Sequence, residues 1–165
     1  MIRAATPADI ARITDVYNEV INEGGYTGDL APLSVEERTA WFGEHTAPHA
    51  IFVKEADGNA VGYATLSPYR KGRQAFAGTC EISYYLASAH RGRGIGKELI
   101  RHALAHAAQA GFSLVVAILL ASNARSISLL EQFGFQERGR LPGAARIGGA
   151  QIDHLYLCRT MSCQK

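Results

Sequence analysis

The sequence has little cysteine, and its cysteines form no pattern. The 165 residues include only Cys80, Cys158 and Cys163, an odd number with no CxxC pair. A disulfide framework or a thiolate metal site needs paired or closely spaced cysteines. The cysteine content therefore argues against both and favours a protein of the reducing cytoplasm.

The sequence also lacks a strong charge of either sign and a long hydrophobic run. Lys and Arg number 17 against 15 Asp and Glu, which gives a formal net charge of +2, and the basic residues are dispersed. Such a balance does not favour nucleic acid as a partner. No apolar run approaches the roughly 20 residues of a membrane-spanning helix, and no secretion signal opens the chain. We expect small molecules as ligands, with no nucleic acid and no membrane as partner.

Turn signals and apolar periodicity predict one domain over residues 1–165 with mixed helices and strands. Asp57-Gly58-Asn59 lies between two apolar runs and is typical of a β-hairpin turn. A helix predicted over 95–110 separates strand-like runs at 80–87 and 113–120. Early hairpins and a later strand–helix–strand unit predict an α+β fold with a mixed, mostly antiparallel twisted sheet and helices packed on it.

Two helix starts precede the hairpin. Thr6 and Pro7 offer an N-cap hydroxyl and a proline at the first helical position. Ser34 and Glu37 match a capping box for a second helix. The segment 24–33 between these helices has turn formers and no period, so we predict a loop there.

The most informative stretch is a glycine-rich turn between a strand-like run and a long amphipathic helix. It reads Arg91-Gly92-Arg93-Gly94-Ile95-Gly96-Lys97. Glycines let the backbone approach a ligand closely, and a helix N-terminus offers unpaired N–H groups to an anion. The turn is therefore a candidate pyrophosphate site, although an isolated glycine triplet is also compatible with a purely structural connection.

Glu81 is the one carboxylate within the apolar strand that precedes this turn. Burial would raise its pKa and suit it to accept a proton near neutral pH. It is a candidate general base, and the alternative is a hydrogen-bonded structural glutamate. Strand alternation predicts that Tyr84 and Tyr85 face opposite sides of the sheet.

These motifs resemble the Gcn5-related N-acetyltransferase (GNAT) superfamily. Residues 91–96 match its Q/R-x-x-G-x-G/A motif, and 121–135 resemble its second motif, an Asn-x-x-Ser helix cap followed by an apolar helix and Gly-Phe. Residues 34–42 and 81–86 narrow the resemblance to the phosphinothricin and methionine-sulfone acetyltransferase branch. The chain departs from that branch at Ala77, where the branch often has Arg, and at Leu130, where it often has His.

The resemblance implies a three-layer α/β/α fold with helices on both faces of the sheet, acetyl-CoA as co-substrate, no metal and a homodimer. It implies that Glu81 is the catalytic residue and that the cofactor-binding residues lie in the strand, the turn and the second motif. The cofactor-binding residues would be Tyr84, Tyr85, Leu86, Arg91, Gly92, Arg93, Gly94, Ile95, Gly96, Lys97, Asn123 and Ser126.

The acceptor would be bound by residues from two loops. The resemblance implies the substrate-binding residues Tyr26, Thr27, Tyr69, Arg70 and Phe76. Arg70 and its basic neighbours Lys71 and Arg73 could clamp a substrate carboxylate or phosphinate, which predicts small anionic amines as acceptors. The alternative is that this basic loop is only solvated.

One further set of polar residues resembles a metal site. Glu98, His102 and His106 are four residues apart and share one helix face. They lie on the polar side of that helix, and no further ligand cluster accompanies them, so we interpret them as a solvated face.

The sequence thus predicts a cytoplasmic N-acetyltransferase that moves acetyl from acetyl-CoA directly to the primary amine of a small amino-acid-like molecule. Two alternatives stay open at this point. One is an acetyltransferase of protein N-termini or lysines, and the other is a non-catalytic acyl-CoA-binding module, which would not need Glu81.

Overall fold

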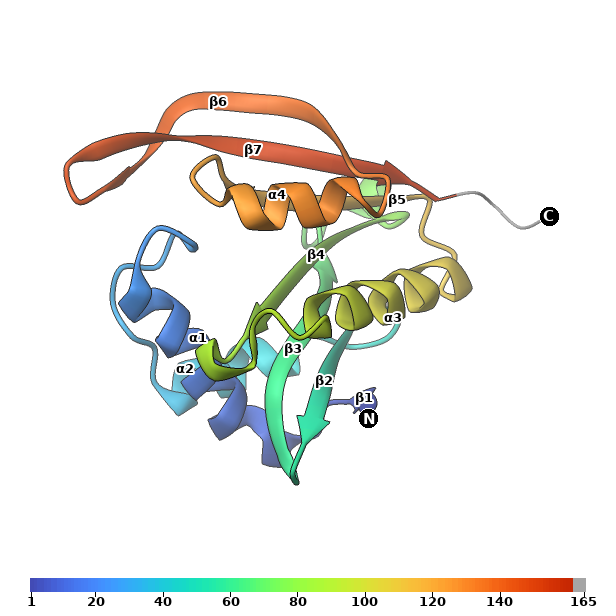
Figure 1. Cartoon of the computed structure of the whole chain (residues 1–165). Helices are drawn as coiled ribbons and strands as arrows, with labels where there is room; N and C mark the ends of the chain where they lie inside the picture. The colour runs from blue at the N-terminus through green and yellow to red at the C-terminus, as the bar shows by residue number, and fades with distance from the viewer. Residues whose placement is uncertain (162–165) are drawn as a thin grey trace.

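The computed structural model describes residues 1–161, which form four α-helices and one seven-stranded sheet (Figure 1). Cys163 lies outside the described residues. The strands are β1 (Ile2–Ala4), β2 (Ala50–Ala56), β3 (Asn59–Pro68), β4 (Thr79–Leu86), β5 (Leu114–Leu120), β6 (Gln136–Ile147) and β7 (Ala150–Thr160), and the helices are α1 (Ile10–Glu23), α2 (Val35–Gly43), α3 (Ile95–Gln109) and α4 (Ala124–Glu131).

The sheet has the strand order β1-β2-β3-β4-β5-β7-β6. Within the described residues β4 and β5 are its one parallel pair, and the other neighbours run antiparallel. The β4–β5 ladder extends only from Thr79–Leu114 to Glu81–Val116, although both strands continue beyond it. The two strands therefore diverge after Glu81 and open a gap in the middle of the sheet.

Helices cover both faces of the sheet, so the predicted α+β fold is confirmed. One apolar cluster joins α3 and α4 to the sheet and contains Cys80 and Ile82, with Tyr84 packed against it. The other joins α1 to the sheet, with Tyr85 packed against it. Successive side chains of a strand point to opposite faces. Tyr84 and Tyr85 thus face opposite sides, as predicted, and Glu81 lies on the α1 face.

The β6–β7 hairpin forms one edge of the sheet. Its tip and the loop that follows α1 lie on the same side of the molecule, at the left of Figure 1. Leu155 and Leu157 of β7 belong to the cluster under α3 and α4. The alternating residues His154 and Tyr156 consequently lie on the same face as Glu81.

The capping box predicted for α2 is present. The Ser34 hydroxyl accepts a hydrogen bond from the Glu37 backbone N–H at 3.2 Å, and the Glu37 carboxylate accepts one from the Ser34 N–H at 2.7 Å. None of the helices in residues 1–161 is long and apolar enough to span a membrane.

The first helix begins three residues later than Thr6 and Pro7 predict. Residues Pro7–Asp9 form a 3-10 turn before α1. The Asp9 carboxylate holds this turn, because it accepts from the Thr6 N–H at 2.7 Å and from both terminal nitrogens of Arg3 at 2.8 and 2.9 Å. These bonds lower the pKa of Asp9 to about 2.

We expect Asp9→Ala to lower the free energy of unfolding at pH 7 by about 1–2 kcal/mol, because it removes the cap and the Arg3 pair. The folded-state pKa is depressed, so the stabilisation is present above the unfolded value near 3.8 and is lost as pH falls through about 2. Urea denaturation of both proteins between pH 7 and pH 2 should therefore converge at the acidic end. A gap that persists unchanged at pH 2 would contradict this account.

Candidate active site

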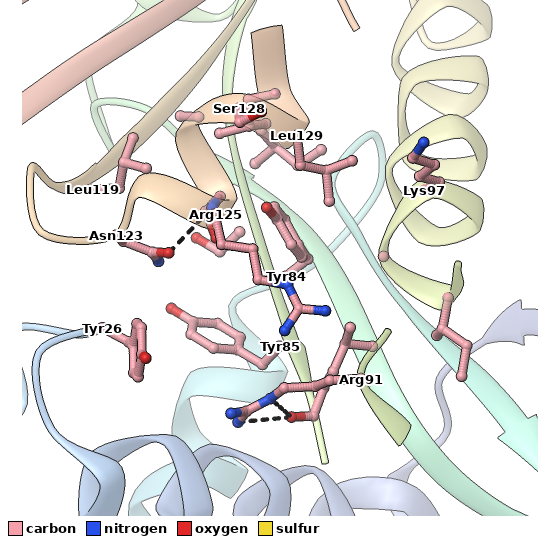
Figure 2. Close-up of a pocket in the computed structure, with 18 of the residues that line it drawn as sticks. Tyr26, Tyr84, Tyr85, Arg91, Lys97, Leu119, Asn123, Arg125, Ser128 and Leu129 are labelled. Atoms are coloured by element: carbon pink, nitrogen blue, oxygen red, sulfur yellow. Dashed lines mark hydrogen bonds between the residues drawn. The ribbon is translucent and has the colours of Figure 1, made fainter. Parts of the chain in front are cut away.

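A cavity of about 480 Å³ occupies the gap between β4 and β5, and we call it the larger cavity. Its walls come from the diverging ends of β4 and β5, the turn before α3, and α4 (Figure 2). Most of the predicted cofactor-binding residues line it; of that set, only Arg93 does not. The predicted residues in its wall are Tyr84, Tyr85, Leu86, Arg91, Gly92, Gly94, Ile95, Gly96, Lys97, Asn123 and Ser126.

The glycines of the turn have the geometry that an anion cradle needs. Gly92 and Gly94 have φ values of 78° and 81°, which L side chains rarely adopt, and open space lies where their Cβ atoms would be. Gly94 is the N-cap of α3, so the unpaired N–H groups of the first helical turn lie at the cavity. A Cβ on Gly96 would lie only 3.2 Å from Leu129, and this glycine therefore lets α3 and α4 approach closely.

Arg91 holds the turn to the end of β4. Its guanidinium donates to the Leu86 carbonyl through Nε at 3.3 Å and through a terminal nitrogen at 3.2 Å, and it pairs with Glu23 of α1. Lys97 on α3 and Arg125 on α4 add positive charge from two sides of the larger cavity (Figure 2). The site therefore combines a helix N-terminus with three cationic side chains, a combination that binds phosphate groups.

The backbone edge of β4 is the second feature of this cavity. From Ile82 to Leu86 the strand has no ladder partner on its β5 side within the described residues. Facing it, Asn123 caps α4, since its side-chain oxygen accepts from the Ser126 N–H at 3.1 Å. An extended ligand could thus hydrogen-bond to β4 as an added strand between β4 and α4.

A second cavity of about 280 Å³, here called the smaller cavity, adjoins the larger one on the α1 face. The two share five wall residues, so they adjoin at the gap in the sheet, and we call them together the cleft. The shared residues are Tyr26, Ser83, Tyr85, Ile118 and Leu119. The smaller cavity is also lined by Thr27, Gly28, Glu81, Leu120, Ala144, Ala145 and His154.

Glu81 stands where the β4–β5 ladder ends, in the wall of the smaller cavity. It is the only acidic side chain in either wall among the described residues. Burial raises the pKa of its carboxyl group because it disfavours the charged form. A carboxylate with a raised pKa in the wall of the smaller cavity can accept a proton at neutral pH.

The loop after α1 is tied down so that Tyr26 and Thr27 face the cleft. The Tyr17 hydroxyl is 2.7 Å from the Thr27 hydroxyl and donates to the Asp29 carboxylate at 2.6 Å. The Tyr17 ring in turn packs edge-on against Tyr85, with the ring centres 4.8 Å apart. The hydroxyl network and the aromatic contact together fix one wall of the smaller cavity.

The other three predicted substrate residues lie outside both walls. Tyr69 and Phe76 pack against each other with ring centres 5.9 Å apart, and the Arg70 guanidinium lies 5.8 Å from the Tyr69 ring centre. Lys71 pairs with Glu44 at 2.7 Å. Acceptor contact by Tyr69, Arg70 and Phe76 stays a prediction.

Sequence reasoning missed His154, which lines the smaller cavity. It reaches the site because β7 lies between β5 and β6, a long-range pairing for which local sequence gives no signal. Leu130, in contrast, is 2% exposed in the core and lines the larger cavity with an apolar side chain.

The three polar residues predicted to share one face of α3 contact side chains of β2. Glu98 pairs with Lys54 at 2.6 Å. His102 and His106 pack edge-on against Phe52 with ring centres 4.7 and 5.2 Å away. No cluster of three potential metal ligands occurs in residues 1–161.

Comparison with known proteins decides the family. The pattern of the Acetyltransferase (GNAT) family matches residues 14–135. The chain belongs to this family. YwnH of Bacillus subtilis is 33% identical to this acetyltransferase over 162 residues, which cover 98% of this chain and 99% of YwnH.

Two further similar proteins have informative names. The L-methionine sulfoximine/L-methionine sulfone acetyltransferase of Pseudomonas paraeruginosa is 30% identical over 158 residues, 94% of this chain and 91% of that protein. A phosphinothricin acetyltransferase from Sinorhizobium meliloti, solved in complex with acetyl-CoA, is 29% identical with a TM-score of 0.93, covering 98% of this acetyltransferase and 88% of that chain.

Proposed function

We propose that this acetyltransferase moves the acetyl group of acetyl-CoA directly to the primary amine of a small amino-acid-like molecule. One observation carries the proposal: two cavities with different linings adjoin at the gap between β4 and β5, and Glu81 lines the smaller one at the point where the β4–β5 ladder ends. A two-substrate reaction by direct transfer needs this arrangement, because both reactants must be held in one cleft.

The larger cavity fits acetyl-CoA. Gly92 and Gly94 leave room for a pyrophosphate at the N-terminus of α3, and Arg91 and Lys97 stand beside it. The free edge of β4 suits the amide-containing pantetheine arm, with Asn123 and Ser126 on its far side. When bound, acetyl-CoA supplies an activated thioester that an amine can attack.

Glu81 would prepare the amine for that attack. An amine is bound mainly as its ammonium ion at neutral pH, and it has no lone pair until a proton leaves. A half-buried carboxylate can take this proton, directly or through one water. Ser83 and Tyr85, which line both cavities, would orient the amine at the junction.

The size and walls of the smaller cavity favour a small acceptor over a protein. Its volume of about 280 Å³ lies between the loop after α1 and the β6–β7 hairpin. Similar proteins named for phosphinothricin and methionine sulfone support an amino-acid-like acceptor. The acidic residue in the wall of the smaller cavity argues against a module that only binds acyl-CoA. A homodimeric assembly and a cytoplasmic location remain predictions from the sequence.

We expect acetyl-CoA to stabilise the protein by roughly 2.7 kcal/mol at about 100 times its dissociation constant. The same protein should release coenzyme A when L-methionine sulfone, L-methionine sulfoximine or phosphinothricin is added. Thermal unfolding and a thiol-release assay measure the two effects. No thermal shift at saturating acetyl-CoA would refute cofactor binding, and faster release with a lysine-rich peptide than with any small amine would refute the small acceptor.

A further inference from the structure

His154 is the only side chain in the wall of the smaller cavity that can carry a positive charge, among the described residues. We propose that His154 binds an oxygen-bearing group on the acceptor at the end remote from the reacting amine, and so selects acceptors that have one. This inference rests on the proposed function. It names the residue that distinguishes acceptors within that function.

The sheet register places His154 and Glu81 at opposite ends of the smaller cavity. Glu81 is level with Val116 of β5, and His154 is level with Leu120, four residues further along that strand. Both side chains are on the α1 face, with Ile118 between them on the same face. The cavity floor thus runs from a carboxylate over an apolar middle to an imidazole.

The length of this path favours a remote group over the carboxylate on the amine-bearing carbon. Four residues along a strand and two strand spacings across separate the two Cα atoms by about 16 Å. Strand side chains stand roughly perpendicular to the sheet. The two side chains can therefore shorten the distance between their Cα atoms only in part by leaning toward each other. An acceptor oxygen several bonds from the amine can reach from Glu81 to His154 better than an oxygen of the carboxylate on the amine-bearing carbon.

The His154 ring is available to a ligand. It packs edge-on against Tyr156 with ring centres 5.4 Å apart, and none of the side-chain hydrogen bonds within residues 1–161 involves its ring nitrogens. His45, on the same face, differs, because one ring nitrogen lies 3.0 Å from the Trp41 carbonyl and the other 2.8 Å from the Ser67 hydroxyl. An imidazole N–H can donate to an oxygen of a carboxylate, sulfone or phosphinate.

Other cations do not take this role in the smaller cavity. Arg91, Lys97 and Arg125 line only the larger cavity. The basic loop of Arg70 and Lys71 lines neither. Among the cationic side chains of residues 1–161, His154 alone is therefore placed to bind an oxygen-bearing end at this distance from Glu81.

The test compares two acceptors of equal chain length, L-methionine sulfone with its distal oxygens and L-methionine without them. Wild type should show the lower KM for the sulfone. We expect His154→Ala to raise the KM for the sulfone about tenfold and to leave the KM for methionine within about twofold. His154→Gln, which keeps an N–H donor, should recover part of the loss. His102→Ala, on α3 outside both walls, is the matched control and should change neither KM.

The ratio of the two KM values is the deciding quantity, because KM does not depend on the amount of active enzyme and partial unfolding lowers only the maximal rates. An equal change in KM for both acceptors, or no change for either, overturns the role of His154. Wild type that acetylates methionine without preferring the sulfone overturns it too and leaves the proposed function intact. Wild type that acetylates no small amine overturns the proposed function, and this assignment falls with it.

Discussion

Glu81→Gln should lower turnover roughly 10²–10⁴-fold near pH 7 while leaving the affinity for acetyl-CoA unchanged. Glutamine keeps the size of the side chain and cannot accept the ammonium proton. Glu81 lines the smaller cavity and not the larger one, so the cofactor site keeps all of its contacts. Steady-state rates at saturating acetyl-CoA and a separate binding titration measure the two effects.

The pH profile distinguishes a base from a merely structural glutamate. Burial raises the pKa of Glu81, so the wild-type kcat/KM should rise as pH passes upward through this raised value and the base becomes deprotonated. The Glu81→Gln variant should lack that rise in kcat/KM. Its activity should recover in part at alkaline pH, where free amine is already present. Near-wild-type turnover of Glu81→Gln at pH 7 would assign the proton transfer to another group.

Stability measurements show whether the variant has simply lost its fold. A carboxyl whose folded pKa is raised destabilises the folded protein as pH rises above the unfolded value, because its charged form is buried at a cost. Glu81→Gln removes that cost and should unfold at an equal or higher temperature at pH 7. Glu131→Gln, an exposed change on α4 outside both walls, is the control and should alter neither turnover nor stability.

Local patterns predicted the parts of the cleft that lie close together in the chain. Residues 80–97 specify a strand, a positive-φ turn and a helix start by their own propensities, and the structure places them so. The hairpin at Asp57-Gly58 and the capping box of α2 were likewise predicted from local sequence. At the first helix, the sequence could not reveal that the Arg3–Asp9 pair holds a 3-10 turn ahead of α1.

The features of the cleft that the sequence did not predict depend on pairing between strands that are distant in the chain. The short β4–β5 ladder creates the gap at Glu81, and its length depends on strands that are distant in the chain. The same holds for His154, which β7 brings to the smaller cavity by pairing with β5. The basic loop at Arg70 shows the converse. It lies close to β4 in the sequence, but the structure places it in neither cavity wall.

The second large effect is expected at the glycine turn. Gly94→Glu should lower the affinity for acetyl-CoA by roughly 10²-fold, because it places a side chain and a negative charge where the phosphates approach the N-terminus of α3. Backbone strain complicates this variant, since φ at Gly94 is 81°. A control must therefore have the same strain away from the cavity.

Gly111 provides that control. It follows α3 at the opposite end of the helix, its φ is also 81°, and open space lies where its Cβ would be, as at Gly94. Gly111→Glu should lose a similar roughly 1–2 kcal/mol of stability from the left-handed conformation and bind acetyl-CoA like wild type. Gly94→Ala, which adds strain without charge, should fall between wild type and Gly94→Glu in affinity. Calorimetric titration with acetyl-CoA compares the four proteins, and equal affinity of Gly94→Glu and Gly111→Glu would mean that the phosphates lie elsewhere than at this turn.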